Sequence, residues 1–238
     1  MCVALLVTLL AALLLGGCDT GMYSLLRDIS TDDESDDGGR GDTADGIGGG
    51  DFEEYARDIV IRSDGSYLLT GRAATGGNQD RMVVWCVTPA GELCSGFNGG
   101  SGYFLPPFTS SQIGHAIGIG PSGSIYVMGR SWPSSRDVTI WKVLSDGSSL
   151  DTSWAGAGAG EKVFTASGTD QAFAGLVEPS GTLLMTGVIG LISDTFVKRY
   201  DPVAETNAAD FDGGSDFVAT KAHGATTYQG GYGIATDS

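Results

Sequence analysis

The sequence is poor in proline, histidine and basic side chains. It has 7 Pro among 238 residues and no three-residue Gly period, which excludes a collagen. Its 13 Lys and Arg stand against 29 Asp and Glu, a formal net charge of −16. This balance argues against nucleic acid as a partner, because phosphate binding needs clustered basic side chains. Two His and four Cys leave little room for a zinc site, so we expect no metal and no cofactor.

Recognisable catalytic motifs are also lacking. The chain contains no Gly-x-Ser-x-Gly elbow, no His pair at metal-ligand spacing and no Gly-x-x-x-x-Gly-Lys phosphate loop. The two histidines, His115 and His223, lie far apart in the sequence. We therefore expect no catalytic residue and favour a protein that is not an enzyme.

Glycine and apolar residues are what the chain has instead. Glycine accounts for 39 of 238 residues, more than twice an average share of about 7%. Hydrophobic residues make up 41% of the chain, which is enough for a folded core.

The N-terminus has the pattern of an export signal. The apolar run over residues 3–15 is shorter than the roughly 20 residues needed to cross a bilayer, and has the length of a signal-peptide apolar region. The string Leu15-Gly16-Gly17-Cys18 resembles the lipobox of bacterial lipoproteins. The resemblance implies a signal peptide over 1–17 and a lipid on Cys18 that anchors the protein in the bacterial cell envelope, at the outer membrane, on the periplasmic face or at the cell surface. The alternative is an ordinary signal peptide followed by a free cysteine.

Residues 18–51 are predicted to be a disordered linker. They contain ten acidic and two basic residues, many glycines and few large apolar side chains. Such a segment cannot bury enough surface to offset its ordering entropy. The acidic run over 32–37 lacks the alternate spacing of a calcium loop, so we interpret it as part of a solvated spacer.

The rest of the chain, residues 52–238, repeats every 58 residues. Two sets of positions keep this step: the turn pairs Asp64-Gly65, Ser122-Gly123 and Ser180-Gly181, and the glycines Gly71, Gly129 and Gly187. Each copy holds two β-rich runs joined by a three-residue turn with Gly in third place, then a second hairpin. Four strands per repeat are about one propeller blade. We predict an all-β protein, a β-propeller of four-stranded blades at about 55–112, 113–170 and 171–228, with a partial copy at 229–238.

A recurring closing motif links these repeats to a family. Phe97, Trp154 and Phe211 are 57 residues apart, and each precedes a Gly-rich stretch. The clearest example is Asp146-Gly-Ser-Ser-Leu-Asp-Thr-Ser-Trp154, which resembles the delta-60 repeat. That resemblance covers about 55–238 and implies propeller-type units of bacterial, often exported, proteins. It implies no catalytic residues, because the family has no common activity.

Three blades and one further strand do not close a ring. An open end would expose unpaired strand edges. The sequence therefore predicts a fragment of a longer protein. The alternative is a natural three-blade form that is completed by oligomerisation, so the oligomeric state stays open.

The cysteines predict one disulfide. With residues 89–91 as the hairpin loop, Thr88 faces Glu92 and Cys86 faces Cys94. Opposed strand positions have Cβ atoms about 4.5–5.5 Å apart, near the reach of a disulfide, and an exported compartment permits one.

Candidate ligand contacts lie on the loops between second and third strands. Asp80, Asp137 and Asp194 recur just before each third strand and could bind cations or sugars. The favoured interpretation is that each carboxylate accepts backbone N–H groups at its loop end. Trp132 is predicted to be an exposed contact on one such loop. His115, whose counterparts are Arg57 and Phe173, is predicted to be a packed or channel-lining side chain.

The sequence thus predicts a lipid-anchored, exported β-propeller that serves as a binding or surface-scaffold module. Its partners would be the membrane, through the lipid, and a surface glycan or protein. One alternative is a glycan-directed enzyme with a channel site completed by missing blades. Another is a structural stalk without a ligand.

Overall fold

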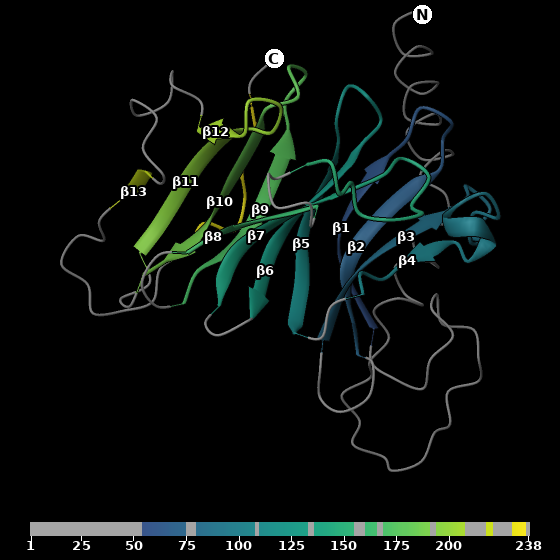
Figure 1. Ribbon diagram of the computed structural model, residues 1–238, viewed down its shortest axis with the longest axis horizontal. Coiled ribbons are helices and arrows are strands. Elements are labelled where there is room, and N and C mark those ends of the chain that lie inside the picture. The colour runs from purple at the N-terminus through teal and green to yellow at the C-terminus, as the bar shows by residue number, and fades with distance from the viewer. Residues whose placement is uncertain are drawn as a thin grey trace, which may run out of the picture.

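Figure 1 shows the computed structural model of the chain. The structure describes residues 54–74, 80–107, 110–132, 136–154, 160–165, 169–190, 194–207, 218–220 and 230–236. The predicted signal peptide 1–17, the linker 18–51 and Cys18 lie outside the described residues. Within the described part of the chain, no helix is both long and apolar enough to cross a membrane.

The described residues form three antiparallel β-sheets that follow one another in chain order (Figure 1). The first sheet contains β1 (Glu54–Ile61), β2 (Tyr67–Ala74), β3 (Asp80–Val87) and β4 (Tyr103–Phe104). The second contains β5 (Ser111–Ile119), β6 (Ile125–Trp132), β7 (Asp137–Val143) and β8 (Glu161–Phe164). The third contains β9 (Gln171–Val177), β10 (Leu183–Ile189), β11 (Asp194–Asp201), β12 (Thr206–Asn207) and β13 (Val218–Thr220). A short 3₁₀ turn spans Asn98–Gly100.

The all-β fold and the four-stranded repeat are therefore confirmed. The fourth row of each sheet is made of two short pieces. Leu93 bridges Val87 before β4 pairs with β3, and Leu150 bridges Val143 before β8 pairs with β7. In the third sheet β12 and β13 both pair with β11. The described residues form three sheets in a row and do not form a closed ring.

The hairpin turns form where the glycine pattern predicts them. The third residue of each predicted loop has a positive φ, at Gly65, Gly91, Gly123, Gly147 and Gly181. A left-handed backbone there is accessible to Gly without a steric penalty. The corresponding loop at Pro202 lacks the glycine, because Ala204 stands in third place. Its positive φ falls on Glu205, and the Asp201 carboxylate caps the turn by accepting the backbone N–H of Val203 at 2.8 Å.

The sheets stack face to face, and this arrangement forms the core. On β6, Ile125 and Val127 pack toward the first sheet while Tyr126 and Met128 pack toward the third. Both faces of the second sheet are thus buried. This explains why β6 is apolar at successive positions and does not alternate with polar residues.

Candidate functional site

A β-bulge recurs at the same place in the first strand of every sheet. The pairing register shifts between Ala56 and Asp58 in β1 and between Gly114 and Ala116 in β5. In β9 it shifts between Ala172 and Ala174, which pair with Gly187 and Thr186 of β10. One residue of each strand is therefore left out of the ladder. These residues are Arg57, His115 and Phe173. Bulges re-aim side chains and are common beside functional sites.

The bulges explain the recurring glycines at the ends of the second strands. Gly71, Gly129 and Gly187 lie opposite the bulges. A Cβ atom at any of them would overlap the carbonyl oxygen of the bulged strand, that of Ile113 in the case of Gly129. The bulge thus requires a glycine at the facing position. The sequence shows the glycines but not the carbonyl that approaches them.

His115 is buried beside two arginines. Its side chain is 9% exposed, and Nε2 has no hydrogen-bond partner among the described residues. Burial, together with the positive charges of Arg57 and Arg130, lowers the pKa of His115 to about 3. The imidazole is therefore neutral at neutral pH. It meets the Phe173 ring edge-on, with 5.6 Å between centroids.

Arg57, Arg72 and Arg130 lie at this end of the sheets, and they differ in their partners. Arg72 forms an ion pair with Asp80 at 2.8 Å and lies over the Tyr55 ring. Arg130 donates to Gln171 Oε1 at 2.9 Å, a bond between the second and third sheets. Arg57 is exposed and makes no hydrogen bond or ion pair with another described residue. Burial of part of its stem, and the charge of Arg72, lower the Arg57 pKa.

Beyond His115, the rings of Phe173 and Tyr232 stack on each other. Residues 230–236 lie against β10, where the N–H of Gly231 donates to the carbonyl of Gly187 at 3.3 Å. Tyr232 stacks on Phe173 with 4.7 Å between centroids and 15° between planes, and it is 67% exposed. We call Arg57, His115, Phe173 and Tyr232 the bulge row.

The predicted acidic residues begin the third strands at the same end of the sheets. Asp80 is held by Arg72 in an ion pair. Asp137 is 3% exposed at the start of β7. Asp194 begins β11, and its side chain lies outside the described residues. In the described part of the chain no group of three His, Cys, Asp or Glu side chains could hold a metal ion.

Trp132 ends β6 and is 47% exposed. The Arg136 guanidinium lies 4.7 Å from the centroid of its ring. One face of this predicted contact residue is therefore covered by a cation.

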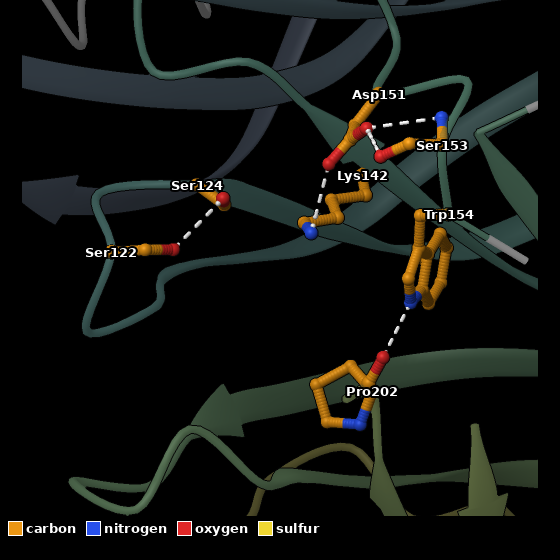
Figure 2. Close-up of polar contacts among 7 residues, drawn as sticks. All are labelled: Ser122, Ser124, Lys142, Asp151, Ser153, Trp154 and Pro202. Carbon is orange, nitrogen blue, oxygen red and sulfur yellow. Dashed lines mark hydrogen bonds and ion pairs between the residues drawn. The ribbon is translucent and has the colours of Figure 1, made fainter. Parts of the chain in front are cut away.

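The closing motif lies at the opposite end and holds the sheets together (Figure 2). Asp151 accepts the backbone N–H of Ser153 at 3.1 Å and pairs with Lys142 at 2.9 Å. These contacts fix the turn that inserts Trp154 between the second and third sheets, where its indole N–H donates to the carbonyl of Pro202 at 2.6 Å. The motif is thus structural. The turn between β5 and β6 also has paired hydroxyls, Ser122 and Ser124, 3.1 Å apart.

The predicted disulfide is present at this end as well. Cys86 and Cys94 are bonded, with 5.3 Å between Cα atoms. The backbone N–H of Cys94 donates to the Cys86 carbonyl at 2.9 Å, and the N–H of Thr88 donates to the carbonyl of Glu92 at 2.7 Å. The register is the one predicted from the hairpin loop.

The sequence did not identify Arg57 or Tyr232 as site residues. A sequence signal for Arg57 exists: positions 57, 115 and 173 differ in chemistry, whereas the glycines at 71, 129 and 187, on the strand that follows each of them, recur. Tyr232 has no such signal, because its contact with Phe173 depends on the packing of residues 230–236.

By its fold, the described protein is a tandem repeat of four-stranded antiparallel sheets. No family model and no curated protein matches the chain. A structural similarity is found to a protein of unknown function from Bacteroides caccae, at 12% identity and a TM-score of 0.38. The alignment covers 65% of this chain and 44% of that one, so this chain spans less than half of that protein's length.

Proposed function

We propose that the chain is a lipid-anchored, exported β-propeller of the delta-60 type that acts as a binding or surface-scaffold module. The 58-residue repeat and the face-to-face stacking of four-stranded sheets support the propeller assignment. Each sheet then corresponds to one blade.

The observation that carries a binding role is the bulge row. The backbone of each bulge and its facing glycine are the same in every sheet, whereas the presented side chain is Arg57, His115 or Phe173. A constant frame with variable side chains is how repeat proteins build recognition surfaces.

Binding is tested with the full chain, solubilised in mild detergent, on an array of neutral glycans, acidic glycans and peptides. We expect retention of at least one class of probe. The array is repeated with two variants. Gly129→Ala disturbs a bulge, and Gly96→Ala is the control, because the Cβ atom that it adds meets no atom within 4 Å. Failure to retain any probe would favour the structural stalk.

Anchoring is carried by the lipobox residues 15–18. Lipid attached to Cys18 would hold the protein at the membrane, and the acidic residues 18–51 would space the sheets from its surface. In a bacterial host fed labelled palmitate, we expect the full chain and its Cys2→Ser variant to be labelled and Cys18→Ser to stay unlabelled. Equal labelling of Cys18→Ser would contradict the assignment.

A further inference from the structure

The bulge row presents a cation, Arg57, that is exposed and forms no hydrogen bond or ion pair with another described residue. The chain as a whole is strongly acidic, yet Arg57, Arg72 and Arg130 gather at this end. Arg72 forms an ion pair with Asp80, and Arg130 donates a hydrogen bond to Gln171. Arg57 has no such partner among the described residues. The charge of Arg72 opposes its own, and the Asp80 carboxylate, which Arg72 already engages, attracts it without a direct contact. A carboxylate would relieve this repulsion, and a guanidinium can bind it through two parallel hydrogen bonds.

The neighbouring imidazole offers an unused hydrogen-bonding atom. A buried polar atom without a partner is unfavourable in a folded protein and calls for an explanation. His115 Nε2 is such an atom among the described residues, and the ring is neutral at neutral pH. A neutral imidazole nitrogen either donates or accepts one hydrogen bond, depending on the tautomer. A hydroxyl group can satisfy it in both cases.

The far end of the row is a flat aromatic surface. Phe173 supports Tyr232 from one side, and two thirds of Tyr232 stays exposed. An aromatic ring held in this way offers a large apolar area at little cost in conformational entropy. The C–H face of a pyranose ring is flat and apolar, and it packs on such a surface.

We propose that the bulge row binds an oligosaccharide that contains a hexuronate. Arg57 pairs with the sugar carboxylate, His115 hydrogen-bonds a sugar hydroxyl, and Tyr232 packs against the face of a neighbouring sugar. This assignment rests on the proposed binding function and names its ligand class. An acidic peptide would supply the carboxylate but neither the adjacent hydroxyl nor the pyranose face, so the row favours the sugar.

The experiment is calorimetric titration of the full chain in detergent with three probes: trigalacturonate, uncharged galactotriose and triglutamate. We expect trigalacturonate to bind at least about tenfold more tightly than either of the other two. Arg57→Gln and Tyr232→Ala should each weaken its binding by about tenfold, the equivalent of about 1.4 kcal/mol. Arg62→Gln is the matched control. It removes the same charge at the opposite end, where Arg62 donates to the carbonyl of Ser145, and should leave binding unchanged.

Thermal denaturation of each variant shows whether it is folded. Absence of trigalacturonate binding by the folded chain would overturn the proposal, as would equal effects of Arg57→Gln and Arg62→Gln. Binding of triglutamate as tight as that of trigalacturonate, unaffected by Tyr232→Ala, would assign the row to a peptide instead. If the array retains other probes while trigalacturonate does not bind, this inference fails and the binding function stands. If nothing is retained, both fail.

Discussion

At the scale of single residues, the recurring glycines at positions 71, 129 and 187 matter because they have no Cβ atom. Each faces a bulged strand whose carbonyl oxygen occupies the space of a Cβ atom. A methyl group there cannot be accommodated by rotating a side chain, because the opposing atom belongs to the backbone. The bulge, and with it the aim of Arg57, His115 and Phe173, depends on these glycines.

Gly129→Ala should therefore destabilise the protein by about 3 kcal/mol, the upper end of the usual range of about 1–3 kcal/mol for overpacking. Urea denaturation of the full chain measures this difference. Gly96→Ala is the control, since no atom lies within 4 Å of its added Cβ, and it should change the free energy of unfolding by less than about 0.5 kcal/mol. Equal effects of the two variants would show that the bulge does not require glycine.

Two ionisable groups at this end, the half-buried Glu54 and the buried His115, give opposite pH dependences. Burial raises the pKa of Glu54 from 4.5 to about 7. The folded state then binds more protons than the unfolded state between these values, so stability falls as the pH rises through this window. The pKa of His115 is lowered from 6.5 to about 3. Here the unfolded state binds more protons, so stability rises with pH from about 3 to 6.5.

Substitutions separate the two contributions. Relative to the unmodified chain, Glu54→Gln should gain stability as the pH rises from 4.5 to 7. His115→Phe, which copies the side chain at position 173, should show its largest relative gain near pH 3 and lose it by pH 6.5. Denaturation series at half-unit pH intervals provide the measurement. Curves parallel to that of the unmodified chain would mean that these groups do not titrate between the folded and unfolded states as described.

At the scale of elements, the closing motif of one sheet contacts the second hairpin turn of the next. Trp154 reaches the carbonyl of Pro202, and Phe97 packs against the position of Gly147 while the N–H of Asn98 donates to Asp146. The two contacts are related by the repeat. Each pair of successive sheets is thus joined by an aromatic side chain of one closing motif that contacts the second hairpin turn of the next sheet.

The packing and the hydrogen bond of Trp154 can be measured separately. Trp154→Ala removes both and should cost about 3–5 kcal/mol. Trp154→Phe, which copies Phe97, keeps most of the packing but leaves the carbonyl of Pro202 without its donor, at a cost of about 1–3 kcal/mol. Guanidinium denaturation measures both variants. A Trp154→Phe variant as unstable as Trp154→Ala would mean that the hydrogen bond outweighs the ring contact.

Much of this element structure could be predicted from local sequence. A glycine in third place of a short loop specifies a hairpin, and the loop length then sets the register that brings Cys86 opposite Cys94. The bulges and the divided fourth strand could not be predicted. They depend on pairing with strands that lie outside the local segment, and no residue type marks them.

At the scale of the whole molecule, each sheet packs against its neighbours in chain order, so stability is distributed along the repeat. The second sheet has a neighbour on both faces. Opening it requires loss of two packed interfaces. The third sheet contacts the second on one face and residues 230–236 on the other.

Hydrogen exchange should reveal this difference. Amides of β6 and β7 should exchange the most slowly in the described protein, and those of β11 and β13 faster. Equivalent positions 58 residues apart, such as Val127 and Met185, compare the sheets at matched local structure because both side chains are 0% exposed. Faster exchange at Val127 than at Met185 would contradict this order of stability.

The sequence by itself determined the repeat, its hairpins, the disulfide and the all-β class. All of these follow from short-range spacing, which a linear chain displays directly. It also predicted the export signal and the acidic linker from composition. Only the tertiary structure placed Arg57, His115, Phe173 and Tyr232 in one row. The reason is physical: a bulge is a shift in hydrogen bonding between strands, and the row joins side chains from four separate segments. Neither exists until the sheets have formed and stacked.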